Sequence, residues 1–307
     1  MPELPEVETV ARGLREVLPG RRIVSVRLGK TDFIDDPSLL EHDLPGSTVA
    51  RIRRLGKFLL LDLESRGSPS EERSLLIHLG MTGKISVCPP ETPVAPHTHV
   101  FLALDDGREL RYNDIRRFGR MALLADGAHE RVLGGLGLEP LEATEEGFRT
   151  RIESRGAHIK ALLLDQRVLR GIGNIYADES LWRAKIHPRK LGAKLTQDEL
   201  RRLQRAVRDI LLEAIRLRGS SVSDYVDSAG QMGEYQLRHR VYQREGKKCF
   251  RCGALIRRII VAGRSSHFCP RCQPPPRADA SKSAAGLKRP LRGSGPYRNK
   301  SKSRRAR

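Results

Sequence analysis

The sequence contains no run of about 18 apolar residues, so it offers no candidate for a membrane-spanning helix. Its charged beginning also lacks the apolar core of a secretory signal. Acidic residues are few beside basic ones, 37 Asp and Glu against 57 Lys and Arg, and the formal net charge is +20. These features predict a soluble, cytoplasmic protein with no membrane partner. The positive excess favours a polyanion such as nucleic acid.

Cysteine is also scarce, and four of the five cysteines form two pairs, Cys249-Phe-Arg-Cys252 and Cys269-Pro-Arg-Cys272, with sixteen residues between them. Two disulfides or a redox pair are disfavoured in a chain without a secretory signal. The spacing is typical of a zinc ribbon. Four thiolates leave no open position for a substrate, so we expect one structural zinc ion and no other cofactor. Cys88 is expected to be an ordinary buried or half-buried thiol.

The chain is long enough for about two domains, and its basic charge is unevenly spread. Residues 273–307 hold four Lys and seven Arg against one Asp, a net charge of +10, which leaves +10 for the other 272 residues. This tail has almost no apolar residues and is predicted to be disordered. A solubilising tail and a non-specific DNA arm are both open interpretations.

Short apolar or alternating runs between residues 22 and 124 predict strands, at 23–28, 49–55, 58–63, 75–79, 100–104 and 121–124. Asp105-Asp106-Gly107 is a hairpin signal, and the polar insert 65–74 is expected to be a surface loop. Such spacing favours a sandwich or a barrel. From about residue 144 the period becomes helical, and it predicts helices at 145–154, 158–166, 176–185 and 196–218. The last of these begins with a capping box, Thr196-x-x-Glu199.

Arg170-Gly171-Ile172-Gly173-Asn174 forms a glycine-bearing turn between two of these helices. Its glycines would let backbone amides approach a phosphate, while the alternative is a helix end with no partner. Residues 219–246 read as a polar loop, a length that is uncommon unless the loop is functional or mobile.

The amino terminus combines Pro2 and Glu3 at the start of a predicted amphipathic helix that runs to Val17. Removal of Met1 would leave a secondary amine with an ordinary pKa of about 7.7–8.0. Such an amine condenses with a sugar carbon to a cationic iminium, which acidifies the adjacent C–H and favours elimination. Glu3 is then a candidate acid. An unspecialised helix start is the alternative interpretation.

Six motifs occur in order: Pro-Glu-Leu-Pro-Glu-Val-Glu-Thr from residue 2, Leu55-Gly-Lys-Phe-Leu-Leu, His78-Leu-Gly-Met, Asp114-Ile-Arg-Arg-Phe-Gly, Gly171-Ile-Gly-Asn-Ile-Tyr-Ala and the four cysteines. Together they resemble bacterial formamidopyrimidine-DNA glycosylases over residues 2–272. The resemblance implies excision of oxidised purines, chiefly 8-oxoguanine and formamidopyrimidines, from duplex DNA, followed by cleavage of the abasic strand.

The implied fold is α+β. A β-sandwich with flanking helices spans 1–130, and a helix-two-turn-helix domain spans 131–240 with a lesion-capping loop at about 219–242. A zinc finger at 241–273 and the disordered basic tail 274–307 complete the chain. The resemblance also implies a monomer that acts on damaged double-stranded DNA. The long basic tail and the insert at 65–74 depart from the family pattern, but neither touches a catalytic motif.

Four residues match the catalytic positions of that family. The resemblance implies that Pro2 is the nucleophile and Glu3 the acid that assists opening of the sugar ring, both after removal of Met1. Lys57 matches the lysine that aids β-elimination, and Arg264, between the two cysteine pairs, matches the arginine of δ-elimination. Arg257 and Arg258 are nearby competitors, but they are expected within a strand rather than at the tip.

Further residues match positions that contact DNA. Met81, Arg116 and Phe118 match a three-residue plug that fills the space left by the extruded base; their thioether, guanidinium and aromatic ring suit stacking and hydrogen bonding. If residues 116–118 are extended, Arg116 and Phe118 face the same way. Contacts to the DNA backbone are implied for His97, Arg117, Arg155, Lys160 and Asn174. His99 is an alternative to His97.

Two other functions compete with this interpretation. Endonuclease VIII uses the same chemistry on oxidised pyrimidines, although that branch typically has glycine where this chain has Leu4. A non-catalytic zinc-ribbon DNA-binding protein is the alternative from another class, and the intact Pro2, Glu3, Lys57 and Arg264 argue against it.

Overall fold

A computed structural model describes residues 1–64, 73–125, 128–222 and 225–276 of the chain. The described helices and strands belong to one compact unit, Met1–Pro275. Residues 277–307 of the tail predicted to be disordered and residues 65–72 of the predicted loop 65–74 lie outside the described residues. No helix in the described ranges is long and apolar enough to cross a membrane.

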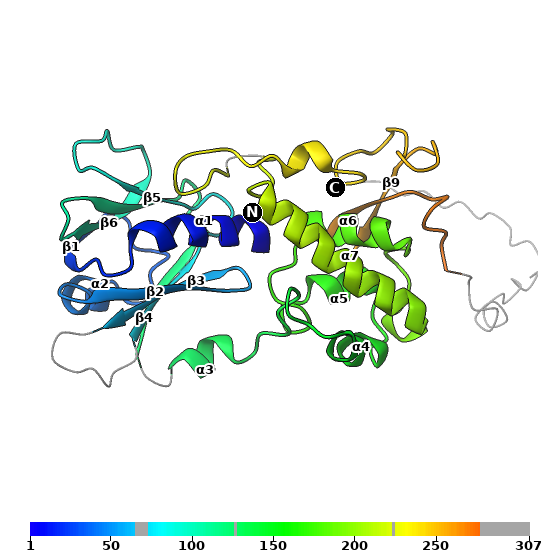
Figure 1. Ribbon diagram of the computed structural model, residues 1–307, viewed down its shortest axis with the longest axis horizontal. Coiled ribbons are helices and arrows are strands. Elements are labelled where there is room, and N and C mark those ends of the chain that lie inside the picture. Colours follow the sequence, from blue (N-terminus) through cyan, green and yellow to red (C-terminus); the bar gives the residue numbers. More distant parts are fainter. Residues whose placement is uncertain (65–72, 126–127, 223–224, 277–307) are drawn as a thin grey trace, which may run out of the picture. The chain divides into compact units, whose positions relative to one another are not determined.

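Two four-stranded antiparallel sheets form the amino-terminal part (Figure 1). The first has the order β2-β3-β4-β8 and the second the order β1-β6-β7-β5. Their strands are β1 Ile23–Leu28, β2 Thr48–Leu55, β3 Phe58–Glu64, β4 Arg73–His78, β5 Lys84–Cys88, β6 Thr98–Leu104, β7 Glu109–Asn113 and β8 Arg120–Leu124. All six predicted strands are confirmed within two residues at each end, and the hairpin at 105–107 joins β6 to β7. Strands β5 and β7 had not been predicted.

The inner faces of the two sheets share one apolar core, which makes them a sandwich. Leu59, Leu61 and Ile77 of the first sheet pack in one buried cluster with Leu102 and Tyr112 of the second. The opposite face of the first sheet is covered by helix α3, Ala128–Leu133. Helix α2, Pro37–Asp43, contacts β1 of the second sheet and β8 of the first.

Helix α1, Leu4–Val17, joins this sandwich to the helical part of the chain. Its Val7 and Leu14 pack in the sandwich core, whereas Leu4 packs in the core of the helices. A buried ion pair reinforces the junction, since Arg54 of β2 lies 3.0 Å from Glu139 and 2.9 Å from Glu8 of α1. The predicted helix at the amino terminus is confirmed, and it belongs to both cores.

The helical part comprises α4 Glu145–Glu153, α5 Ile159–Leu164, α6 Asn174–Ala184, α7 Gln197–Arg216 and the short 3₁₀ turns Gly192–Lys194 and Tyr235–Arg238. Helix α7 begins with the predicted capping box. Glu199 N donates to Thr196 Oγ1 at 3.3 Å, and Thr196 N donates to Glu199 Oε2 at 2.9 Å. The buried face of α7 packs on α6 and α1 (Figure 1).

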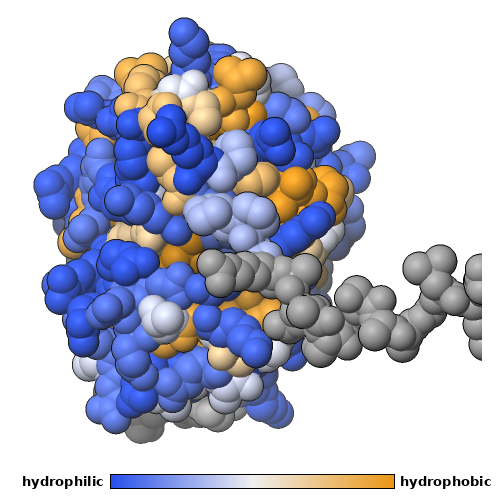
Figure 2. All heavy atoms as spheres, turned by 90° about the vertical axis from the view of Figure 1, so that its right-hand side faces the viewer, coloured by the Kyte–Doolittle hydropathy of each residue, from blue (hydrophilic) through white to orange (hydrophobic). Residues whose placement is uncertain are grey.

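A two-stranded hairpin completes the unit, with β9 Arg257–Val261 antiparallel to β10 Arg264–Phe268. Ala262 and Gly263 form its two-residue turn and both have positive φ, 49° and 70°, a conformation that suits a tight hairpin. Viewed from the side of β9, hydrophobic residues form separate patches among hydrophilic ones (Figure 2). The predicted α+β class, with sandwich, helices and four-cysteine hairpin, is confirmed.

Candidate active site

The Glu3 side chain is buried at the amino-terminal end of helix α6. Its carboxylate accepts hydrogen bonds from Gly173 N at 2.8 Å, Ile175 N at 3.0 Å and Tyr176 N at 3.5 Å. Free amides and the positive end of the helix dipole make this a favourable place for an anion. Burial nevertheless raises the pKa of Glu3, against the opposing effects of Lys57 and these amides. The carboxyl therefore holds its proton more readily than an exposed glutamate, as a general acid requires.

The glycine-bearing turn before α6 is shaped to receive the amino terminus. Leu4 N donates to Gly171 O at 2.9 Å, and a Cβ at Gly173 would lie 2.4 Å from the Glu3 Cδ. Gly171 has a φ of +92° and contacts Leu4 so closely that a Cβ would meet that side chain at 2.8 Å. The turn does present its amides to an anion, as one interpretation of the sequence held, but that anion is the carboxylate of Glu3.

Glu6 lies one turn further along α1 and is equally buried. Its carboxylate accepts hydrogen bonds from Glu3 N at 2.8 Å, from Ser220 N at 2.7 Å and from the Tyr176 hydroxyl. Burial, and then the nearby Glu3 charge, raise the pKa of Glu6 to about 7. This side chain, for which the sequence predicted no role, connects the amino terminus to α6 and to the first residues after α7.

Lys57 occupies the tight turn between β2 and β3, where Leu55 pairs with Phe58. Gly56, with a φ of +59°, precedes it, and a Cβ at Gly56 would approach Arg170 and Gly171 at 3.0 and 3.1 Å. The hairpin tip therefore lies against the glycine-bearing turn. Lys57 is 8% exposed. Burial lowers the pKa of its amine, the charges of Glu3 and Glu6 oppose this effect, and Arg264 adds to it.

Arg264 is the first residue of β10, directly after the two-residue turn, and its side chain is exposed. Strand β10 is attached to the helices by a buried ion pair. Lys160 of α5 lies 2.6 Å from Asp178 of α6, and its Nζ donates to Ser265 O at 2.6 Å. The same Asp178 accepts from His267 N at 2.8 Å. Burial lowers the pKa of both Lys57 and Lys160, and the charge of Arg264 lowers both further.

The three residues predicted to form a plug lie on two adjoining loops. A Cβ at Gly80, next to Met81, would lie 2.4 Å from the Phe118 carbonyl carbon. The Arg116 guanidinium stacks 4.5 Å from the centre of the Phe118 ring. Met81 and Phe118 are 39% and 56% exposed, so neither belongs to the core. Arg117, which lies between Arg116 and Phe118, has a positive φ of 51°. Residues 116–118 are therefore not extended, and the argument that Arg116 and Phe118 face the same way on a strand does not apply.

Asp114 fixes these two loops to each other. Its fully buried carboxylate accepts hydrogen bonds from the Thr82 hydroxyl and from Gly119 N at 2.9 Å, and Arg116 N donates to Thr82 Oγ1 at 3.1 Å. The Tyr112 hydroxyl donates to the same carboxylate at 3.2 Å. The backbone of the loops is thus held firmly, while the side chains they carry project outwards.

Among the residues matched to contacts with the DNA backbone, His97 and Arg155 are exposed, and Asn174 is half-buried at the start of α6. His99 is buried, so exposure favours His97 over its neighbour. Arg117 is half-exposed and forms an ion pair with Asp32 at 2.8 Å.

Lys160, which the resemblance matches to a contact with the DNA backbone, is 0% exposed, and its ammonium group is paired with Asp178. The low dielectric of the interior makes a partner for such a charge necessary, and a sequence does not reveal that partner.

The four paired cysteines converge, and all their sulfur atoms lie within 4.8 Å of one another. Zinc–sulfur bonds of about 2.3 Å in a tetrahedron place the sulfurs about 3.8 Å apart, so this donor set fits a metal ion. Backbone amides reinforce the site, since Arg251 N donates to Cys249 Sγ and Cys272 N donates to Cys269 Sγ, each at 3.4 Å. Cys88 lies apart and is half-buried, as expected.

Sequence reasoning missed one more buried carboxylate, that of Glu179 on α6. It accepts hydrogen bonds from the consecutive amides Arg240 N, Val241 N and Tyr242 N at 2.8 to 3.0 Å. These amides lie where the predicted lesion-capping loop passes into the cysteine hairpin. The signal available in the sequence was the adjacent pair Asp178-Glu179 inside an otherwise apolar helical pattern.

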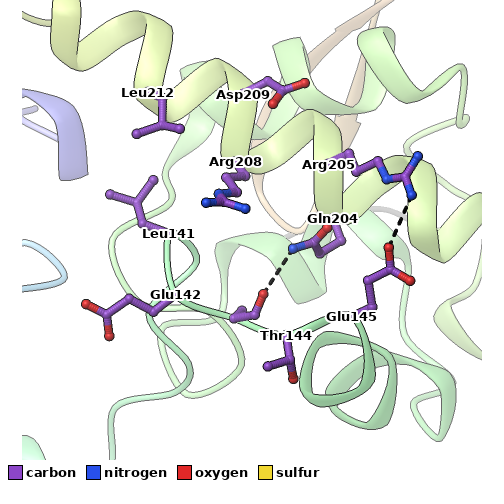
Figure 3. A pocket seen from close by; sticks show the side chains of 10 residues that line it. Leu141, Glu142, Thr144, Glu145, Gln204, Arg205, Arg208, Asp209 and Leu212 are labelled. Atoms are coloured by element: carbon purple, nitrogen blue, oxygen red, sulfur yellow. Dashed lines mark hydrogen bonds and ion pairs between the residues drawn. The ribbon is translucent and has the colours of Figure 1, made fainter.

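A pocket of about 530 Å³ lies between residues 141–145 and α7 (Figure 3). Gln204 Nε2 donates across it to Ala143 O at 3.0 Å, and Arg205 pairs with Glu145 at 3.4 Å. None of the catalytic or DNA-contacting residues predicted from the sequence lines this pocket. The candidate active site is therefore the cluster around the amino-terminal end of α6, where the Glu3 carboxylate is held and the charge of Lys57 acts on it.

Three family descriptions match the chain. They are the formamidopyrimidine-DNA glycosylase N-terminal domain over residues 1–121, the formamidopyrimidine-DNA glycosylase H2TH domain over residues 136–226, and a zinc finger found in FPG and IleRS over residues 246–275. A formamidopyrimidine-DNA glycosylase of Pelotomaculum thermopropionicum is 45% identical over 279 residues, which cover 89% of this chain and 99% of that relative.

Two solved structures of Lactococcus lactis Fpg are also similar, each 36% identical and covering 89% of this chain and 100% of the solved chain. One is a mutant in complex with Fapy-dG containing DNA, with a TM-score of 0.82, and the other a complex with abasic-site DNA, with a TM-score of 0.81. Fold, site and matches together define the class of DNA glycosylases. Within that class, the chain belongs to the formamidopyrimidine-DNA glycosylase family.

Proposed function

We propose that this enzyme excises oxidised purines, 8-oxoguanine and formamidopyrimidines, from duplex DNA and then cleaves the strand at the abasic site. The observation that carries the proposal is the buried Glu3 carboxyl at the amino-terminal end of α6, with Pro2 beside it in the chain and the Lys57 charge acting on it. An acid with a raised pKa next to an amine is what ring opening at a sugar carbon requires.

The first stage joins the enzyme to the sugar. After Met1 is removed, the Pro2 nitrogen forms a bond to C1′ and the bond between C1′ and the base nitrogen breaks, so the base leaves with the electron pair and takes up a proton. Glu3 donates a proton to O4′ as the ring opens. The product is an iminium between Pro2 and C1′, which is the electron sink for strand cleavage.

The second stage is strand cleavage. A base removes a proton from C2′, and the electrons expel the phosphate from C3′; the analogous δ step then expels the phosphate from C5′. Lys57 is assigned to the first elimination because burial lowers the pKa of its amine, so a neutral base is accessible. Arg264 is assigned to the second, since a guanidinium binds two phosphate oxygens at once. Water finally releases Pro2 and the sugar fragment.

DNA binding in this proposal uses the exposed side chains of the plug loops. Met81 and Phe118 replace the lost stacking when the damaged nucleotide leaves the helix, and Arg116 bonds the unpaired base. His97, Arg117, Arg155 and Asn174 contact the backbone of the DNA. The segment 219–242 closes over the extruded base; residues 223 and 224 within it lie outside the described part of the chain.

The remaining assignments complete the proposal. The metal of the four-cysteine site is one structural zinc ion, supported by the all-thiolate donor set, and no further cofactor is needed. The enzyme acts as a monomer in the bacterial cytoplasm. Its functional parts are the sandwich at 1–130, the helical domain at 131–240, the finger at 241–273 and the tail at 274–307.

Borohydride trapping tests the proposal directly, since reduction fixes only a covalent iminium. The protein would be incubated with duplexes that carry 8-oxoguanine, a formamidopyrimidine, an oxidised thymine or no lesion. We expect an adduct with the first two duplexes that maps to Pro2 and is lost in Pro2→Gly. Pro5→Gly, a change at the other proline of the same helix start, is the matched control and should retain trapping.

Other outcomes select between the alternatives. Trapping chiefly on oxidised thymine would replace the substrate class by that of an endonuclease VIII. Absence of any adduct, from a protein with a processed amino terminus, bound zinc and normal DNA affinity, would reduce the chain to a zinc-ribbon DNA-binding protein.

A further inference from the structure

Trp182 is the single tryptophan of the chain and lies near the end of helix α6, the helix whose first amides hold Glu3. It is 9% exposed. Its side chain belongs to a small buried cluster with Val241, Ile256 and the cysteines of the metal site. A residue of the helical domain thus forms part of the wall of the cysteine site.

The indole N–H of Trp182 lies inside this buried cluster. It is buried and forms no hydrogen bond of ordinary geometry within the described part of the chain. Cys249 and Cys269, two of the four cysteines of the metal site, are buried in the same cluster as the indole. Leaving a buried donor without an acceptor costs about 1–3 kcal/mol, so such a group calls for a partner that the protein alone does not supply.

A metal-bound thiolate is that partner. A neutral thiol is a weak acceptor, whereas a thiolate carries negative charge and forms charge-assisted hydrogen bonds. Cys249 already accepts the backbone N–H of Arg251 at 3.4 Å, and the Arg251 side chain packs on the Trp182 ring in the same buried cluster. Groups that hold a metal ligand from outside commonly alter metal affinity by about 10–100-fold.

We propose that Trp182 donates its indole N–H to the metal-bound thiolate of Cys249 and so fastens the zinc site to helix α6. The inference rests on the proposed zinc ion and goes beyond it, because it assigns a role at the metal to a residue outside the four-cysteine motif. It also makes α6 a single rod with the acid of the active site at one end and the metal site at the other.

Arg251 supplies a matched control. Its guanidinium lies 4.2 Å from the Trp182 ring and donates to Trp182 O at 3.2 Å, so it holds the indole from the other side. Arg251→Ala removes that contact but leaves the indole N–H and the backbone N–H to Cys249 in place. Trp182→Phe keeps an aromatic ring and removes the N–H.

A same-shape replacement separates hydrogen bonding from packing. Because the chain has one tryptophan, the whole protein can be produced with a tryptophan analogue in which sulfur replaces the ring N–H. Zinc affinity of the full-length protein would be measured by competition with a chromophoric chelator, and zinc content by elemental analysis. Cobalt substitution would report the thiolate-to-metal charge-transfer band, whose energy depends on hydrogen bonds to the sulfurs.

We expect the analogue and Trp182→Phe to bind zinc at least about tenfold more weakly than the wild type and to shift the cobalt band. Arg251→Ala should weaken zinc binding by about two- to fivefold, the equivalent of a cation–π contact, without shifting the band. An analogue with wild-type zinc affinity and an unshifted band overturns the role of Trp182 while leaving the zinc assignment intact. A wild-type protein without zinc overturns both.

Discussion

The candidate functional side chains differ in exposure between two regions: they are mostly buried around helix α6 and mostly exposed on the loops at Met81 and Arg116–Phe118. Around α6 the charged groups are buried and have partners. Glu3 accepts hydrogen bonds from three backbone amides, and Asp178 forms an ion pair with Lys160 at 2.6 Å. On the loops the backbone is fixed by Asp114, but Met81 and Phe118 remain substantially exposed. The part assigned to bond making is therefore organised before DNA arrives, and the part assigned to filling the DNA helix stays free to adapt.

The largest effect is expected from Asp178→Ala, which removes a buried charge on α6. It leaves the Lys160 ammonium buried without a counter-charge and frees the backbone of β10, which ends the restraint on Arg264. We expect a loss of about 3–5 kcal/mol in the free energy of unfolding, measured by urea denaturation. If the enzyme folds at low temperature, the second elimination should fall more than base excision. A loss below about 1 kcal/mol would contradict the buried pair.

Glu6→Gln tests the buried carboxylates through their pH dependence. The pKa of Glu6 is raised to about 7 in the folded protein from an ordinary 4.5, so the unfolded chain releases this proton first. Folding stability therefore falls as pH rises from about 4.5 to 7, by a few kcal/mol for this group.

Urea denaturation at pH 5 and pH 8 checks this effect. The wild type should lose more stability than Glu6→Gln between the two pH values, because glutamine does not titrate and its amide oxygen still accepts a hydrogen bond. Glu3, with its pKa raised by burial, keeps part of the slope in both proteins. Equal slopes would show that Glu6 is ionised throughout.

Asp114→Asn tests whether the fixed backbone of the two loops matters for their exposed side chains. The side-chain NH₂ of the asparagine would face one of the groups that now donate to the carboxylate, Gly119 N or the Tyr112 hydroxyl. Two donors facing each other should lower the free energy of unfolding by about 1–3 kcal/mol. Excision measured in single turnovers should slow more than DNA binding weakens, because the plug side chains lose their fixed base. Asn113→Ala, at the half-buried neighbouring residue that ends β7, is the control and should change excision little.

The smallest effect is expected at the surface pair of Arg117 and Asp32. Both side chains are partly exposed, so Asp32→Ala should leave the free energy of unfolding almost unchanged. The change frees a guanidinium assigned to the DNA backbone, so affinity for duplex DNA should rise slightly and depend more steeply on salt. Weaker DNA binding after this substitution would exclude a phosphate contact for Arg117.

The sequence predicted the fold well where a pattern is local. The capping box at Thr196, the cysteine spacing and the apolar runs of the sandwich each depend on neighbours in the chain, and all are confirmed. The catalytic assignments came from family motifs and stay proposals. A lysine is exposed by default, whereas Lys57 is buried in a hairpin turn.

What sequence reasoning missed depends on distant partners. A charged residue is exposed by default, so Glu6, Glu179 and Lys160 gave no sign of burial. Their partners lie far along the chain, for example Ser220 for Glu6 and Arg240 for Glu179. The glycine-bearing turn shows the same limit, because its geometry was foreseen but its anion, the carboxylate of Glu3, belongs to a distant part of the sequence.

The binding of Glu3 to α6 also sets an order of events during synthesis. The amino terminus leaves the ribosome first, yet the amide of Gly173 that holds its carboxylate lies 170 residues later. At about 5–20 residues per second, that separation delays assembly of the acid site by roughly ten to thirty seconds. A nascent or truncated chain that lacks α6 therefore lacks the amides that hold the Glu3 carboxylate. In the function proposed above, only the completed protein brings the Pro2 amine and its acid together.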